Sequence, residues 1–167
     1  MNARILFKLS GVAALLGGLL RMASALPLPL TTMSLEALWT IIDILLSLGL
    51  IGIYLVRAGK LGLLGLAGFV LSMASLSFIG GPDADVFGFS TYAQGAAALA
   101  ISLVGLSIAW LRGNERPLAP PLLWFGSVLA VGLMGMLPAP LPSYGFPLAG
   151  ALFGAAFVWA GWDLIRR

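Results

Sequence analysis

The chain has 167 residues, of which 60% are hydrophobic and 9% are charged. Soluble domains average about 25% charged residues, so this composition excludes an ordinary soluble domain, and its hydrophobicity excludes a disordered chain. The sequence contains neither Cys nor His, which excludes disulfides, thiolate nucleophiles and histidine ligation of metals or haem. We therefore expect a non-enzymatic membrane protein with no catalytic residues, no cofactor and no metal site.

Apolar runs of about 20 residues, the length that crosses about 30 Å of hydrocarbon, occur six times. They cover residues 5–26, 35–56, 61–80, 91–111, 118–137 and 146–165. Ser34 precedes the second run and Ser90 or Thr91 opens the fourth, as expected of helix N-caps. The sequence predicts an all-α polytopic membrane protein, a single domain over 1–167. Short connections should pair the six helices into three antiparallel hairpins, about 5–56, 61–111 and 118–165.

The basic residues gather on one side of this layout. Eight of the nine fall there: Arg4, Lys8, Arg57, Lys60, Arg112, Arg116, Arg166 and Arg167. The opposite connections carry no Lys or Arg but hold Asp83 and Asp85. The positive-inside rule then predicts cytoplasmic termini and an integral protein of the bacterial inner membrane. Small basic clusters between apolar runs also argue against a nucleic-acid partner and favour the lipid bilayer.

Aromatic residues near the predicted membrane boundaries fit interfacial belts, and a packing role is an equal alternative for each of them. Trp110 and Trp162 lie near the inner boundary, and Trp39, Tyr92 and Tyr144 lie near the outer one.

The N-terminal segment also has the pattern of a secretory signal peptide. Arg4 and Lys8 precede an apolar stretch and then Ala23-Ser24-Ala25, which resembles a cleavage site. Arg21 interrupts the segment just before that site, so we interpret it as the first transmembrane helix.

The first and third apolar runs resemble each other when the sequence is shifted by 51 positions. Identical residues then occupy seven of the seventeen positions from Leu9 to Ala25, including Met22-Ala23-Ser24 on Met73-Ala74-Ser75. A weaker match relates the second run to the fourth. Since consecutive hairpins start on the same side, this pattern predicts a parallel internal repeat.

Small residues recur at helical spacing in these runs. The third run carries Gly65, Gly68, Ser72 and Ser75, and the fourth carries Thr91, Gly95, Ala98, Ser102, Gly105 and Ala109. Small residues let helices approach closely in lipid, so the rows predict packing seams.

Two charges interrupt the matching rows of the first hairpin. Arg21 stands where the repeat has Ser72, and Asp43 stands where it has Ala98. At 1.5 Å per residue, Arg21 lies about 7 Å below the outer end of its predicted helix and Asp43 about 12 Å below the start of its own. A charge at such depth costs about 2.5–3.5 kcal/mol, so intramembrane charges are functional candidates.

Three interpretations of Arg21 and Asp43 remain open at this point. They form an ion pair that locks the first two helices, with Thr40 and Ser47 adding hydrogen bonds. Alternatively they belong to a polar site in the outer half of the bundle, with Tyr92 and Gln94, that binds a small solute or relays a proton. In the third interpretation Arg21 extends toward the interface and Asp43 is protonated.

Two further acidic features have simpler interpretations. The Asp-x-Asp sequence of Asp83 and Asp85 lacks the other ligands of an EF-hand loop, which favours a solvated turn. Asp163 should pair with Arg166 or Arg167, or face the membrane interface.

In length, helix number and cytoplasmic termini, the chain resembles the substrate-binding S-components of energy-coupling-factor vitamin transporters. Its hairpin layout is also similar to bacterial acid-resistance membrane proteins. The resemblance covers the layout of the whole chain and implies no role for any residue. Our first hypothesis is an accessory or scaffold subunit of a membrane assembly, with other membrane subunits as partners. The alternative is a small-solute transporter or substrate-binding component, and a lipid-modifying enzyme is disfavoured by the missing His and Cys.

Overall fold

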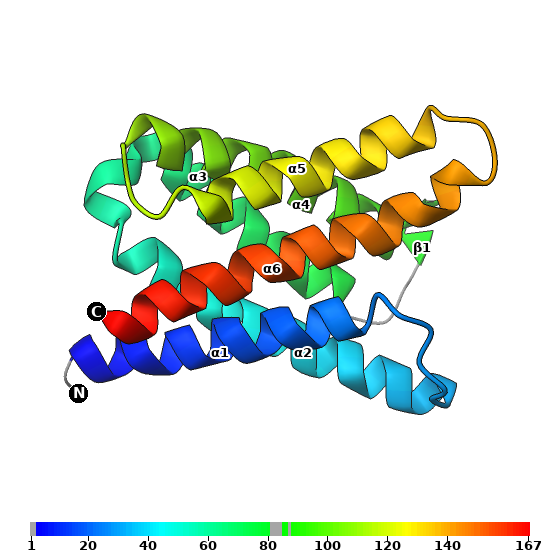
Figure 1. Cartoon of the computed structure of the whole chain (residues 1–167), viewed down its shortest axis with the longest axis horizontal. Helices are drawn as coiled ribbons and strands as arrows, with labels where there is room; N and C mark the ends of the chain where they lie inside the picture. The colour runs from blue at the N-terminus through cyan, green and yellow to red at the C-terminus, as the bar shows by residue number, and fades with distance from the viewer. Residues whose placement is uncertain (1–2, 81–84, 87) are drawn as a thin grey trace.

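The computed structural model describes residues 3–80, 85–86 and 88–167, which form a bundle of helices (Figure 1). The helices are α1 (Ala3–Ala23), α2 (Thr32–Leu55), α3 (Ala58–Ile79), α4 (Thr91–Arg112), α5 (Ala119–Gly135) and α6 (Gly145–Arg166). Two short antiparallel strands, β1 (Asp85–Val86) and β2 (Phe89–Ser90), precede α4, and a 3-10 helix, η1 (Leu141–Tyr144), precedes α6. Asp83 of the Asp-x-Asp sequence lies outside the described residues, and Asp85 is described only as part of β1.

The predicted all-α class is confirmed, and the apolar helices fit an integral membrane protein. Five helical stretches are long and apolar enough to cross a membrane: α1, α2, α3, α4 and the stretch from η1 through α6. The predicted span 118–137 is instead a helix of 17 residues, about 26 Å long at 1.5 Å per residue. It ends early because Pro138 and Pro140 follow and supply no backbone N–H to continue it. The division into three hairpins and the internal repeat stay predictions.

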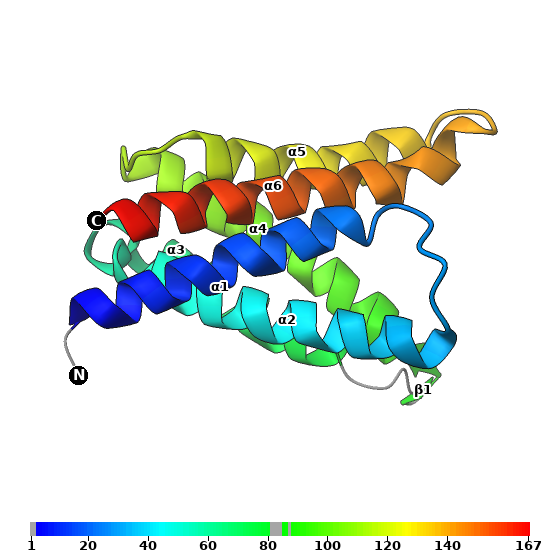
Figure 2. The same ribbon diagram turned by 60° about the horizontal axis from the view of Figure 1, so that its bottom comes forward.

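The bundle has two distinct ends (Figures 1 and 2). One end, here called the terminus end, carries both chain termini and the connections α2–α3 and α4–α5. The other, here called the loop end, carries the connections α1–α2 and α5–α6 and the two strands.

The first and last helices pack closely along their length (Figure 2). Glycines face glycines there: a Cβ added to Gly18 would lie 2.5 Å from the Gly154 carbonyl oxygen, and one added to Gly161 would lie 2.5 Å from that of Gly11. These four residues form the α1–α6 glycine seam. Backbones this close require residues without side chains, which is how helices associate in lipid.

Helices α3 and α4 form a second close pair. The row Gly65, Gly68, Ser72 and Ser75 is buried, and a Cβ on Gly68 would lie 2.9 Å from the Leu106 backbone nitrogen of α4. The Ser72 and Ser102 hydroxyls are hydrogen-bonded at 2.7 Å across this interface. These contacts confirm that the small-residue row of the third run is a packing seam.

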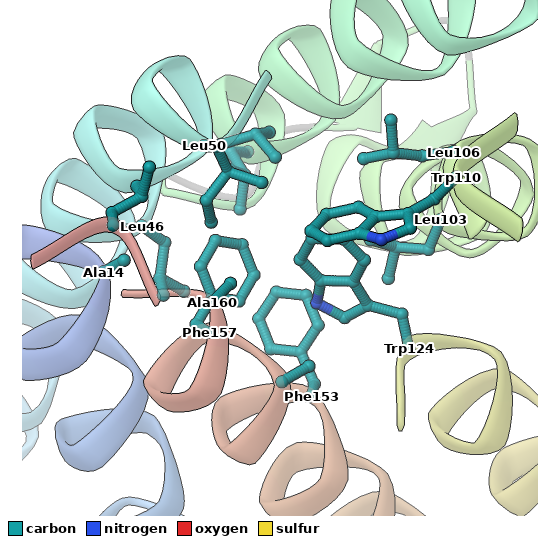
Figure 3. Close-up of a cluster of buried hydrophobic side chains, with 14 of the residues drawn as sticks. Ala14, Leu46, Leu50, Leu103, Leu106, Trp110, Trp124, Phe153, Phe157 and Ala160 are labelled. Atoms are coloured by element: carbon teal, nitrogen blue, oxygen red, sulfur yellow. The ribbon is translucent and has the colours of Figure 1, made fainter. Parts of the chain in front are cut away.

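The core receives side chains from all six helices, and its aromatic rings come from α4, α5 and α6 (Figure 3). Trp110 and Trp124 meet edge to face with ring centroids 5.9 Å apart, and Phe157 meets Trp124 at 5.2 Å. Phe157 also lies beside Leu46 and Leu50 of α2 (Figure 3). Trp110 is fully buried, so it belongs to the core and not to an interfacial belt.

Two helix boundaries near the predicted charge pair differ from those expected. Helix α1 ends at Ala23, three residues early, and the Ser24 hydroxyl donates a hydrogen bond to the Arg21 carbonyl at 2.9 Å, an interaction that competes with helix continuation. Helix α2 begins at Thr32 because the Thr31 side chain caps it, accepting from the Ser34 N–H at 3.3 Å. At α4 the expected cap is confirmed, since Ser90 accepts from the Ala93 N–H at 3.2 Å.

Two glycines that the repeat aligns have different roles. Gly11 lies in the α1–α6 glycine seam, whereas Gly62 kinks α3 with φ 60° and ψ −164°. Residues with a side chain rarely adopt that backbone conformation. Glycine is therefore present at the two aligned positions for two different structural reasons.

Candidate functional site

Arg21 borders a small cavity between α1 and α6 at the loop end of the bundle. The cavity has a volume of about 180 Å³ and is lined by Arg21, Ser24 and Ala25 of α1 and by Phe146, Pro147 and Gly150 of α6. Arg21 lies in the last turn of α1, where the partial negative charge of the helix end favours a cation.

Asp43 borders a separate groove between α2 and α3, here called the α2–α3 groove. Its volume is about 420 Å³, and its lining residues are Thr40, Asp43, Ile44, Ser47, Leu48, Ile51, Met73, Leu76, Ser77 and Gly80. Helices α2 and α3 pack less closely than the other pairs of consecutive helices. Tyr54 and Phe69, stacked at 4.3 Å, are a contact between them.

No ion pair links Arg21 to Asp43 in the part of the chain that the structure describes. Arg21 lies two residues from the end of α1, and Asp43 lies eleven residues into α2. Their side chains border different cavities, although the Arg21 charge is near enough to act on the Asp43 carboxyl group electrostatically. The end of α1 and the start of α2 were each predicted three residues too late; the relative depth of the two charges stays a prediction.

The other predicted site residues are divided by the structure. Thr40 and Ser47 line the α2–α3 groove with Asp43, although the exposed Thr40 hydroxyl donates to the Glu36 carbonyl at 2.9 Å. Tyr92 and Gln94 are exposed in the first turn of α4, and neither lines the Arg21 cavity or the groove. The structure thus brings together Asp43, Thr40 and Ser47.

A charged cluster that sequence reasoning missed lies at the terminus end. Its centre is Arg57, whose side chain is fully buried and pairs with Asp163 of α6. The Arg57 guanidinium also lies over the Trp110 ring, 4.0 Å from the centroid, and donates to the Ile53 carbonyl at 3.2 Å. Burial lowers the pKa of Arg57 to about 10, with Asp163 acting in the opposite direction, so the guanidinium stays charged at neutral pH.

Further charges near Arg57 come from the start of α3, from the α4–α5 connection and from the end of the chain. Glu115 lies 4.0 Å from the Arg57 Nε and 2.8 Å from the Lys60 Nζ. Its backbone carbonyl accepts the Trp110 indole N–H at 3.1 Å. Arg167 approaches Asp163 at 3.1 Å, which confirms the expected pairing of Asp163 with a C-terminal arginine. The hydrogen bond from Lys60 is the main cause that lowers the pKa of Glu115.

One signal in the sequence could have indicated this cluster. Glu115 and Asp163 are the acidic residues on a side that otherwise holds eight cations, and acids placed among cations near helix ends suggest specific pairing. The pattern does not tell which cation is buried. In the described part of the chain, no three acidic residues gather in a way that could hold a metal ion.

Comparison of the chain with descriptions of known families, with curated proteins and with solved structures gave no match.

Proposed function

We propose that this chain is a non-enzymatic subunit of a membrane assembly whose α2–α3 groove receives a transmembrane helix of a partner protein. The observation that carries the proposal is the position of Asp43. This carboxyl group lies near the middle of a 24-residue apolar helix and faces the α2–α3 groove. It forms no ion pair or hydrogen bond within the described residues.

Charge complementarity indicates the chemistry of the partner. An ionisable group within an apolar helix is costly without a partner in contact with it, and Arg21 acts on Asp43 only from a distance. A helix that carries a Lys, an Arg or another hydrogen-bond donor at the level of Asp43 would satisfy the carboxyl group. Thr40, Ser47 and Ser77 would contribute further polar contacts along the α2–α3 groove, and hydrogen bonds of this kind join helices in lipid.

The shape of the bundle supports the same occupant. The α2–α3 groove runs along two helices and is lined mainly by apolar side chains between its polar ones. Ile44 and Leu48 are 56% and 49% exposed, so a second apolar helix could cover them. We further propose that the terminus end, with its eight cations, faces the cytoplasm of a bacterial cell, in accord with the positive-inside rule.

Site-directed cross-linking in native membranes tests the proposal. The chain contains no Cys, so one introduced thiol carries one photoreactive label. Ile44→Cys places the label in the α2–α3 groove, and Leu129→Cys is the matched control near the middle of α5, where the side chain is 45% exposed. We expect one protein adduct from Ile44→Cys that is absent from Leu129→Cys and is lost when Asp43→Asn is added.

The adduct must be a membrane protein whose transmembrane helix carries a basic or hydrogen-bond-donating residue at the level of Asp43. Adducts to lipid alone, or an adduct that persists unchanged with Asp43→Asn, would overturn the proposal. A cross-link between two copies of this chain would replace the partner protein with a homo-oligomer.

Transport of a small solute is the second candidate, favoured by the two cavities that border Arg21 and Asp43. It requires a water path to the groove, which a docked helix would close. Ser47→Cys distinguishes the two functions in intact cells. Reaction with a membrane-impermeant thiol reagent supports transport, and protection from the reagent supports a docked helix.

A further inference from the structure

The cavity beside Arg21 has a cation but no anion. In the described part of the chain, the Arg21 guanidinium forms no ion pair and no hydrogen bond. Its neighbours in the cavity are Ser24, whose hydroxyl is engaged with the Arg21 carbonyl, and side chains without charge. The guanidinium is partly buried and no carboxylate touches it; Asp43 acts on it electrostatically from outside the cavity.

The opposite wall of the cavity gives the guanidinium room to lie flat against α6. A Cβ added at the buried Gly150 would lie 3.7 Å from both the Nε and the Nη2 of Arg21. These two nitrogens belong to one edge of the guanidinium, and such an edge donates two parallel hydrogen bonds to one oxyanion. A Cβ at position 150 would touch this edge of the guanidinium at an ordinary contact distance, and a branched side chain would fill the space beside it.

The size and depth of the cavity indicate which anion it would hold. A volume of about 180 Å³ accommodates a group of several non-hydrogen atoms, since a water molecule in the liquid takes about 30 Å³. Arg21 lies in the last turn of an apolar helix, and the ends of a helix that crosses a membrane lie near the headgroup region of the bilayer. Phe146, Pro147 and Ala25 add apolar walls, which suit a phosphate attached to a hydrocarbon-bearing group.

We propose that the cavity between α1 and α6 binds a phosphate group through the Arg21 guanidinium. The phosphate comes from the headgroup of an anionic phospholipid or from a free phosphate ion. The Arg21 cavity shares no lining residue with the α2–α3 groove, so a phosphate group and a docked partner helix would not compete for the same space.

The first arm of the test measures lipid binding to the full-length protein in detergent. Native mass spectrometry follows titration with phosphatidylglycerol, with a neutral glycolipid as the comparison lipid. We expect the unchanged protein to bind one phosphatidylglycerol molecule. Arg21→Gln should bind it at least tenfold more weakly, which corresponds to a loss of about 1.4 kcal/mol of binding free energy. Arg21→Lys keeps the charge but not the fork, so it should bind with intermediate affinity.

The matched control is Arg112→Gln, because Arg112 also lies in the last turn of an apolar helix but borders neither described cavity. It should bind phosphatidylglycerol as the unchanged protein does. Gly150→Val should weaken binding without removing any charge, since its branches would enter the space beside the guanidinium. Circular dichroism verifies that each variant is folded.

The second arm adds inorganic phosphate to delipidated protein and measures thermal stability, with chloride at equal ionic strength as the reference. Stabilisation that requires Arg21 would identify free phosphate as a ligand, and lipid binding without such stabilisation would assign the cavity to a headgroup. Equal lipid binding by the unchanged protein and Arg21→Gln, with no effect of phosphate, would overturn the proposal. An equal loss in Arg112→Gln would also overturn it, because binding would then follow overall charge.

Discussion

The two arginines that share Asp163 should differ greatly in their contribution to stability. Arg57 and Arg167 both approach the same carboxylate oxygen, but the Arg57 side chain is 0% exposed and the Arg167 side chain is 40% exposed. Removal of one member of a buried pair costs about 3–5 kcal/mol, whereas an exposed pair contributes about 0–1 kcal/mol.

The neighbouring charges suggest that Arg57→Gln should lower the free energy of unfolding by an amount at the lower end of the range of about 3–5 kcal/mol. Asp163 keeps Arg167 and Glu115 keeps Lys60 in that variant, so neither carboxylate is left alone. We expect a loss of about 3 kcal/mol. At about 2–4 °C per kcal/mol for a chain of this size, the Tm should fall by about 6–12 °C. Arg167→Gln should lower it by less than about 4 °C.

Thermal unfolding in detergent micelles measures both variants. Tryptophan fluorescence is a suitable signal because Trp110, which stacks on Arg57, and Trp124 are fully buried. Circular dichroism at low temperature confirms equal helix content before heating. Equal shifts for the two variants, or a larger shift for Arg167→Gln, would refute the reasoning that burial decides the contribution of each arginine.

Three further predictions concern the seams, the kink and acid stability. Gly18→Ala should lower the free energy of unfolding by about 1–3 kcal/mol, because its Cβ would meet backbone atoms across the α1–α6 glycine seam. Gly132→Ala, with open space around it, should be neutral or stabilising in the same thermal assay. Equal effects of the two substitutions would contradict the seam. Gly62→Ala should lower the free energy of unfolding by about 1–3 kcal/mol because position 62 has a positive φ. Gly59→Ala, at a position that is also free of close neighbours, should not lower it. Unchanged stability of Gly62→Ala would disprove the conformational argument. The pKa of Glu115 is lowered from 4.5 in the folded protein, so its contribution is present above that pH and is lost as pH falls through the folded value. Glu115→Gln should therefore flatten the decrease of Tm below about pH 4.5, and an unchanged pH profile would count against the Lys60 hydrogen bond.

The helices and one of their seams followed from local patterns, because hydropathy and residue spacing act within a single helix. Gly68 and Ser72 share one face of α3 by their spacing alone, and the structure places that face against α4. The spacing of residues within one helix does not show which helices that are far apart in the sequence pack together. Nothing in the periodicity of α1 shows that Gly18 faces Gly154 of α6 and not a residue of α3.

The charged residues show the same limit in a sharper form. The predicted depth of Arg21 depended on where α1 ends, and a single hydroxyl, that of Ser24, bonds to the backbone there. The pairing of Arg57 with Asp163 depends on the ends of α2 and α6 meeting in space. Asp43 stands out in the sequence as a charge in an apolar run, but its neighbours could be assigned only from the packing of α2 on α3.

The close packing of the first helix on the last has a consequence for biosynthesis. Helix α1 leaves the ribosome first, yet the glycines that fit against it belong to the helix that is made last. The side of α1 that carries Gly11 and Gly18 therefore cannot be covered by its final partner until α6 has been made. The contacts between α1 and α2 can form early in synthesis, whereas the α1–α6 glycine seam forms last.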